Sequence, residues 1–155
     1  MISTYQDTFA GSPWFENWSS VEVKEIIQEA LNQDEFVGKV IKQSSLDDIL
    51  AFVWGYKVPS VNTQTVCFSQ IYDKLKELGK EDFFYLAECG VIQESQNKGL
   101  GKLILEEFQK EVPNLIFRTK NENMLKVIED VYGEIRELFY DPVNSDRMWY
   151  EVSRK

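Results

Sequence analysis

The sequence predicts one α/β (α+β) domain with a mixed, mostly antiparallel sheet of about six strands flanked by helices. The chain has 155 residues, 43% of them hydrophobic and 14% aromatic, which suits a single core. A strand, helix, strand, helix succession in the middle of the chain requires a parallel pair of strands, because parallel strands need a crossover connection. Polar connections elsewhere indicate antiparallel hairpins. No repeat or linker divides residues 1–155, so we expect one domain.

The first part of the chain predicts two helices and a hairpin. Ile2, Tyr5 and Phe9 recur at helical spacing, and a break at residues 11–13 ends this short helix. Ser19 or Ser20 can cap a second helix, whose apolar stripe spans residues 23–31 before Asn32. Two β-type runs follow, at residues 36–41 and 49–58.

In the rest of the chain, segments with helical periodicity alternate with segments typical of strands. Glycine or proline ends each of the predicted helices, at Gly79, Pro113 and Gly133. The helices are expected at residues 68–79, 100–112 and 121–133, and the strands at residues 83–92, 114–119, 134–140 and 147–153.

The composition excludes several classes of function. There are 17 basic and 26 acidic residues, for a formal net charge of −9, and such a surface repels the nucleic-acid backbone and anionic lipid. We therefore expect neither a nucleic-acid partner nor a membrane partner. A cationic partner is easier to accommodate, although an acidic surface also serves solubility alone.

Cysteine and histidine usage limits the chemistry. Cys67 and Cys89 have no metal-type spacing and are too few for a disulfide framework, which fits a reducing, cytoplasmic location. The start of the chain has no basic export signal, and no apolar run approaches the roughly 20 residues that span a bilayer. Histidine is absent, which excludes a Ser-His-Asp triad and a His-ligated metal. No metal site is expected.

A glycine-containing stretch at residues 91–108, VIQESQNKGLGKLILEEF, opens the helix at residue 100. It is not a Walker loop, which would need glycine at Gln96 and a hydroxyl at Leu103, and the dinucleotide motif GxGxxG fails at Ile104. Gly99 and Gly101 would let an anion approach the free amides of the first helical turn. The alternative is a tight turn that needs glycine only for backbone geometry.

The segment Gln96-Asn97-Lys98-Gly99-Leu100-Gly101 resembles motif A of the GCN5-related N-acetyltransferases. The resemblance extends back to the aliphatic strand end at Val91 and to the order of elements from residue 36 onward, and residues 121–124 resemble motif B of the same family. It implies an acetyl-CoA-dependent N-acetyltransferase that transfers acetyl to the amine of a small molecule or peptide by direct attack. The sequence departs from the family at Gln93, where proline is usual, and at Ile128, where a tyrosine is usual.

A further departure concerns the start of the sheet. Members of the family generally begin with a strand, whereas residues 2–9 have a helical pattern, so the usual first strand is expected to be missing. The strand at residues 36–41 would then lie at an exposed edge of the sheet, which makes a homodimer plausible.

The resemblance also implies a binding site for acetyl-CoA. The pyrophosphate would lie on the loop formed by Gln96, Asn97, Lys98, Gly99, Leu100, Gly101 and Lys102, with the motif B asparagine Asn121 nearby. The main chain at Cys89 and Val91 would hold the pantetheine arm. The Cys89 thiol itself is expected to be a small core group and not a nucleophile.

Proton transfer needs a group other than histidine. Glu88, in an otherwise apolar strand, is the first candidate for the base, and Tyr85 is the second choice; a solvent-facing position would make Glu88 ordinary. Tyr132 lies one helical turn beyond Ile128 and could replace the usual tyrosine, or it could simply pack.

Three residues before the second helix are candidates for acceptor binding. Trp14, Glu16 and Trp18 could hold a cationic amine through aromatic faces and a carboxylate, and the alternative is that the tryptophans anchor the helix to the sheet. Two rival functions remain open: an acyl-CoA-binding regulatory module without turnover, and an unrelated anion-binding domain.

Overall fold

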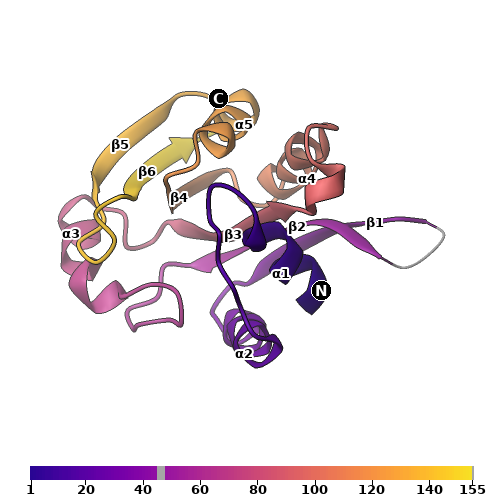
Figure 1. Ribbon diagram of the computed structural model, residues 1–155. Helices are drawn as coiled ribbons and strands as arrows, with labels where there is room; N and C mark the ends of the chain where they lie inside the picture. Colours follow the sequence, from indigo (N-terminus) through magenta and orange to yellow (C-terminus); the bar gives the residue numbers. More distant parts are fainter. Residues whose placement is uncertain (45–47, 155) are drawn as a thin grey trace.

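The computed structural model describes residues 1–44 and 48–154. Six strands form one sheet in the order β1-β2-β3-β4-β6-β5, in which only the β3–β4 pair is parallel. Helices cover both faces of this sheet (Figure 1). The mixed, mostly antiparallel fold predicted from the sequence is confirmed. The elements are α1 Ile2–Ala10, α2 Ser20–Leu31, β1 Val37–Lys42, β2 Ile49–Lys57, η1 Phe68–Gln70, α3 Tyr72–Glu77, β3 Phe84–Val91, η2 Gln93–Ser95, α4 Leu100–Gln109, β4 Asn114–Thr119, α5 Glu122–Tyr132, β5 Ile135–Tyr140 and β6 Met148–Ser153.

Most element boundaries follow local chemistry that the sequence already displays. The Ser19 hydroxyl accepts from the Glu22 amide, and the Glu22 carboxylate accepts from the Ser19 amide, which is a complete capping box for α2. The predicted helix at residues 68–79 is wrong in extent. A 3₁₀ turn occupies its first residues, and α3 begins only after Ile71, whose φ of −121° is not helical. The fourth predicted helix also ends earlier, because α4 stops at Gln109.

The two faces of the sheet carry two separate cores. On one face, α1, α2 and the α3 region pack through residues such as Tyr5, Val23 and Leu75. On the other, α4 and α5 pack through Phe108 and Ile128, and Figure 1 shows these two helices next to each other. The strands between them are therefore covered on both sides, which explains why β2 reads as a nearly continuous apolar run.

The parallel strands β3 and β4 pair over only two positions, Phe84 with Leu115 and Tyr85 with Ile116. Beyond Tyr85, β4 stays paired with β6 and β3 stays paired with β2, so the two parallel strands diverge. The main chain of β3 from residue 86 to residue 91 therefore has no strand partner on its β4 side among the described residues.

A β-bulge interrupts β3 at the start of this divergence. Trp54 of β2 lies opposite Glu88 while its neighbour Gly55 lies opposite Leu86, so Ala87 is an extra residue. Leu86 and Cys89 pack against the core under α4 and α5, whereas Tyr85 and Ala87 face the core under α1. The bulge turns Glu88 to the α1 side, where strict alternation from Leu86 would not place it.

The expected absence of the usual first strand is confirmed. In the described part of the chain, α1 comes before any strand, and β1 is an edge strand paired only with β2. The homodimer suggested by that edge stays a prediction. Within residues 1–44 and 48–154, no helix combines the length and the apolar character needed to cross a bilayer.

Gly55 tests the packing at the bulge. A Cβ atom at this position would lie 2.5 Å from the Tyr85 carbonyl oxygen and 3.2 Å from the Phe108 ring. We expect Gly55→Ala to destabilise the protein by about 1–3 kcal/mol, as overpacking does. The measurement is urea unfolding.

Gly101→Ala is the matched control, because a Cβ atom there would lie no closer than 3.8 Å to its neighbours. It should be neutral or should stabilise α4 by about 0.5–1 kcal/mol. Equal stabilities of the two variants would contradict this account of the bulge.

Candidate active site

A groove of about 560 Å³ lies where β3 and β4 diverge. The end of β3, the loop before α4 and the first residues of α4 and α5 line it. The predicted cofactor residues Cys89, Val91, Gln96, Asn97, Gly99, Leu100, Gly101, Lys102 and Asn121 all border this groove. Lys98 does not border it; this residue is exposed on the loop.

The loop before α4 has the backbone shape of an anion cradle. Asn97 and Gly99 both adopt left-handed conformations, with φ of 60° and 82°. No atom lies within 4 Å of the place where a Cβ atom of Gly99 would be, so this part of the loop is open. The first amides of α4 follow directly and have no partner within the helix. Gly101 shows no left-handed φ, so the backbone requirement for glycine applies at Gly99 only.

Side chains fix the loop and the neighbouring helix. Gln96 Nε2 donates to the carbonyl oxygen of Val91 at 3.2 Å and so ties the loop to the end of β3. Asn121 Oδ1 accepts from the amides of Asn123 and Met124 and caps α5. These bonds give Gln96 and Asn121 positioning roles at the groove.

A second cavity, of about 250 Å³, lies on the α1 side of β3. It is bordered by α1, the loop between α1 and α2, the middle of β3, the end of β4 and the turn between β5 and β6. Three residues, Trp14, Cys89 and Met124, border both cavities. The two cavities therefore meet beside Cys89.

Glu88 borders this second cavity because of the bulge in β3. Its carboxylate accepts a hydrogen bond from the Tyr5 hydroxyl of α1. Removal from bulk water raises the pKa of Glu88 to about 8; the Tyr5 bond works against this rise, and the nearby Glu16 adds to it. Glu88 therefore exchanges its proton near neutral pH, as a general base should.

Tyr85 lies next to Glu88 on the same face and is 2% exposed. Burial raises its pKa to about 12, and the adjacent Arg118 guanidinium, which donates to the Tyr85 hydroxyl, opposes that rise. Tyr85 is thus a neutral phenol at the wall of the cavity, held by a cation.

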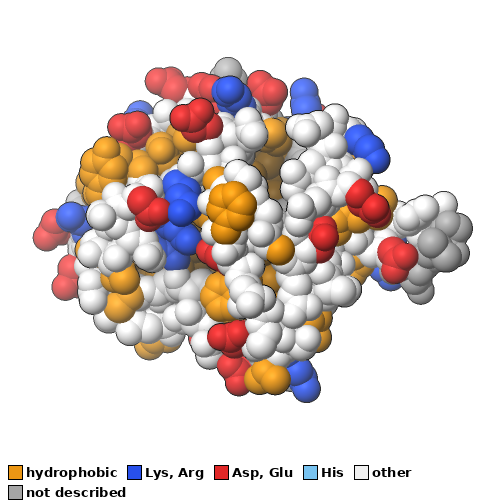
Figure 2. All heavy atoms as spheres, viewed as in Figure 1, with side chains coloured by type: hydrophobic (Ala, Val, Ile, Leu, Met, Phe, Trp, Pro, Cys, Tyr) orange, Lys and Arg blue, Asp and Glu red, His pale blue; other side chains and the backbone are white. Residues whose placement is uncertain are grey.

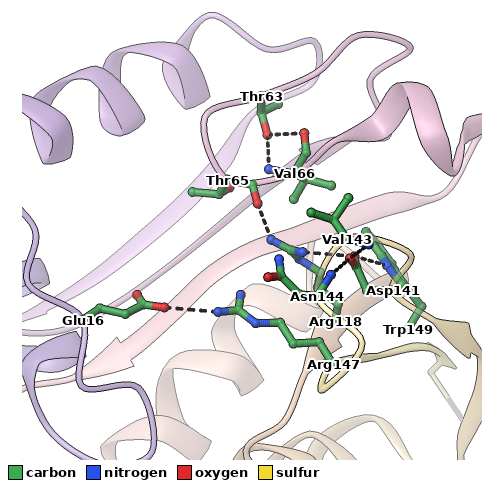
Figure 3. A network of polar contacts seen from close by, with 10 residues as sticks. All are labelled: Glu16, Thr63, Thr65, Val66, Arg118, Asp141, Val143, Asn144, Arg147 and Trp149. Carbon is green, nitrogen blue, oxygen red and sulfur yellow. Dashed lines mark hydrogen bonds and ion pairs between the residues drawn. The ribbon is translucent and has the colours of Figure 1, made fainter.

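Arg118, on β4, belongs to a buried polar network that borders this cavity next to the turn between β5 and β6 (Figure 3). Its guanidinium donates to Asp141 Oδ2 at 3.0 Å and to the Thr65 carbonyl oxygen. Asp141 also accepts from Trp149 Nε1 and from the amides of Val143 and Asn144. These bonds hold the pKa of Asp141 below its usual value despite its burial, so the pair is ionised and the turn after β5 is fixed.

The tyrosine predicted to replace the missing proton donor lies elsewhere. Tyr132 is 1% exposed, packs in the core under α4 and α5, and donates to the Val112 carbonyl oxygen at 3.0 Å. It borders neither cavity. Its contacts give it a packing role and do not support the predicted catalytic one. Burial also raises the pKa of the Cys89 thiol to about 12, so that thiol is neutral.

The three predicted acceptor residues all border the second cavity, but Glu16 is not free to hold an amine. Its Oε2 atom accepts from Trp18 Nε1 at 2.8 Å, and its Oε1 atom accepts from Arg147 at 3.1 Å. Trp14 lies between the two cavities, with the Arg147 guanidinium 5.2 Å from its ring. The three residues thus line one cavity together with Arg147, a cation not predicted from the sequence, and their role in acceptor binding stays a prediction.

The polar residues at the second cavity that were not predicted include Tyr5, Arg118 and Arg147. The sequence does point to Arg118, because it lies in the largely apolar strand NLIFRT, where burying a charge is costly unless the charge is paired. Tyr5 belongs to the apolar stripe of a helix, which gives no functional signal, and Arg147 follows a turn whose position depends on long-range contacts. Figure 2 shows basic side chains between the loop that joins α1 to α2 and the turn that joins β5 to β6.

Replacement of Glu88 by glutamine should stabilise the fold in a pH-dependent way. The folded protein binds a proton at Glu88 up to about pH 8, whereas an unfolded glutamate releases it near 4.5. Wild-type stability should therefore fall, relative to Glu88→Gln, as the pH rises from 4.5 through 8. One pKa unit corresponds to about 1.4 kcal/mol, and because Glu88 is only partly buried and borders a cavity we expect a difference on the order of 2 kcal/mol.

Thermal unfolding at several pH values measures this difference. Glu25→Gln makes the same substitution on the exposed surface of α2 and should show no such window. A constant difference between Glu88→Gln and the wild type from pH 5 to pH 9 would contradict the raised pKa.

Comparison with models of protein families and with curated proteins finds no match, whereas comparison with solved structures finds many. PH1933 from Pyrococcus horikoshii OT3 matches with a TM-score of 0.67 and 14% identity, over 99% of this chain and 88% of its own. The ribosomal-protein-S18-alanine N-acetyltransferase from Escherichia coli matches with a TM-score of 0.54 and 15% identity, over 99% and 87%. A candidate streptothricin acetyltransferase from Bacillus anthracis str. Ames, in complex with acetyl coenzyme A, matches with a TM-score of 0.50 and 16% identity, over 83% and 68%. The chain has the fold of the GCN5-related N-acetyltransferases.

Proposed function

We propose that the protein is an acetyl-CoA-dependent N-acetyltransferase that acts on the amine of a small molecule or peptide. The observation that carries this proposal is the meeting of the two cavities beside Cys89. One cavity contains an open, left-handed loop before a helix, and the other contains a carboxylic acid that exchanges its proton near neutral pH. A transferase needs both a site for the activated acyl group and a base for the acceptor amine.

The groove suits acetyl-CoA in two ways. The free amides at the start of α4, with Lys102 and Lys120 at the border, would bind the pyrophosphate. The unpaired main chain of β3 would accept and donate hydrogen bonds along the amide-containing pantetheine arm. The bound thioester would then supply an acetyl group next to Cys89, at the junction of the cavities.

Glu88 is proposed as the general base. The amine attacks the thioester carbonyl carbon only when its nitrogen is neutral, so a proton must leave that nitrogen, directly or through water, and Glu88 takes it. The carbon–nitrogen bond forms, the carbon–sulfur bond breaks with its electron pair leaving on sulfur as a thiolate, and the acylated nitrogen releases its second proton to water to give the neutral amide. An ordinary thiol has a pKa near 8.5, so this thiolate can leave without a protein acid and take its proton from water.

The second candidate function is an acyl-CoA-binding module without turnover. It is favoured by one observation: on α5, Ile128 is buried and Tyr132 bonds to Val112, so neither offers a proton donor to the junction. The two functions predict the same ligand in the groove and differ only in thiol release.

Acetyl-CoA binding tests the shared part of both proposals. A ligand at about 100 times its Kd should stabilise the fold by about 2.7 kcal/mol, which is readily seen as a rise in Tm. Gly99→Val should abolish that rise, because the side chain would fill the open side of the loop and strain its left-handed backbone.

Gly79→Val is the matched control. Gly79, after α3, is also left-handed, with φ of 66° and no atom within 4 Å of its Cβ position, but it borders neither cavity. Both variants should lose comparable stability, and only Gly99→Val should lose the response to acetyl-CoA. No Tm rise in the wild type at millimolar acetyl-CoA would refute the proposal.

The role of Glu88 is tested by turnover, with thiol release from acetyl-CoA as the assay. Glu88→Gln should lower kcat by on the order of 10²-fold or more, because it removes the base while acetyl-CoA binding stays intact. Wild-type activity should rise with pH up to about 8, where Glu88 loses its proton. In Tyr132→Phe turnover should stay within about twofold, since that hydroxyl serves packing. An unchanged kcat in Glu88→Gln would remove it from the mechanism.

A further inference from the structure

Four charged side chains border the second cavity, which would hold the acceptor amine: Glu16, Glu88, Arg118 and Arg147. What each can still bind depends on how far its hydrogen-bonding capacity is already used within the protein. This capacity can be counted, since a carboxylate accepts through two oxygens and a guanidinium donates through five N–H groups.

Two of the four are already engaged by neighbouring groups. Arg118 donates to Asp141, Thr65 and Tyr85, and its charge is balanced by the buried Asp141 carboxylate. Glu16 accepts through one oxygen from Trp18 and through the other from Arg147. Arg118 and Glu16 are therefore less available than the other two side chains to bind an acceptor.

Arg147 is different. In the described part of the chain its guanidinium makes one hydrogen bond, from Nη2 to Glu16 at 3.1 Å, which leaves four of its five N–H groups available. The side chain is 22% exposed and borders the cavity, and Figure 3 shows it extending toward Glu16 from the turn that holds Asn144.

The position of Arg147 is also fixed in advance. The turn before it is closed by the bond from the Arg147 amide to the Asn144 carbonyl oxygen and by the bonds that Asp141 accepts. The Trp14 ring supports the guanidinium on one face, at 5.2 Å. A fixed guanidinium with free N–H groups is a receptor for a planar anionic group, because its fork matches two oxygens.

We propose that the acceptor amine also carries a carboxylate, which binds Arg147 while the amine lies at Glu88. The inference rests on the proposed function and names its substrate class: a free amino acid or a compound of similar size with both groups. The cavity of about 250 Å³ is smaller than the roughly 300–1,000 Å³ typical of drug-sized ligands. A phosphate would fit less well, because its second charge would face Glu16 and Glu88.

Binding of matched pairs tests this without any need for turnover. Calorimetry would compare each acid with its decarboxylated amine: leucine with isoamylamine, phenylalanine with phenethylamine, tryptophan with tryptamine and lysine with cadaverine. Each titration is run without CoA and with CoA, which fills the groove but cannot react. β-Alanine and phosphoethanolamine compare a carboxylate with a phosphate.

We expect at least one acid to bind about tenfold or more tightly than its amine, as loss of a charge-assisted bidentate contact would predict. Arg147→Gln should remove this preference and leave the amine's affinity unchanged, and Arg147→Lys should keep part of it. The control is Arg154→Gln, an exposed arginine that borders neither cavity and should leave the preference intact.

Three results would overturn the inference: amines that bind as tightly as their acids in every pair, no binding of any acid at millimolar concentration, or an equal loss for acid and amine in Arg147→Gln. Preferred binding of phosphoethanolamine would overturn the choice of carboxylate. Failure of the proposed function is a separate outcome, because acetyl-CoA would then cause no rise in Tm, whatever the acids do in the titrations without CoA.

Discussion

The divergence of β3 from β4 is the constraint on which the rest of the site depends. Parallel strands are held together by evenly spaced main-chain bonds, and here those bonds stop after Tyr85. Each strand remains paired on its other side, β3 with β2 and β4 with β6. The main-chain groups that face the gap are within reach of water, so the divergence does not bury unpaired main-chain groups. The gap lets a groove on one side of the sheet meet a cavity on the other.

The bulge at Ala87 places a carboxylic acid, Glu88, in the cavity beside this gap. A carboxylic acid on the Leu86 face would lie in the core under α4 and α5, where nothing among the described residues would use it. One extra residue places Glu88 beneath α1 instead, within reach of the Tyr5 hydroxyl. Gly55 makes this possible, because any larger residue opposite the bulge would collide with the Tyr85 carbonyl. A packing requirement in β2 thus supports the position of Glu88, the proposed base, in β3.

Much of the fold could be predicted because its signals are local. The capping box at Ser19 and the glycine after α5 mark element ends in the sequence itself. The helix expected at residues 68–79 failed because its first turn follows tertiary packing: Phe68 and Ile71 are both buried, yet the backbone between them is not α-helical. Local periodicity does not separate those two outcomes.

The site was predictable on its groove side and less so on its acceptor side. The loop at residues 96–102 is one continuous segment with a recognisable pattern, so its residues, Lys98 excepted, border the groove as expected. The partners of Glu16 could not be read in this way, since Arg147 reaches it only through the folded sheet. The same holds for Tyr132, whose hydroxyl finds Val112, a residue of the loop after α4.

The ion pair between Glu16 and Arg147 joins residues 131 positions apart, near the two ends of the chain. Contacts across so long a separation carry a larger loop-closure entropy than contacts within one segment. The groove, by contrast, is bordered mostly by the continuous segment 89–127. The groove therefore depends mainly on one continuous segment, whereas the second cavity also needs residues from both ends of the chain, brought together by the folded sheet.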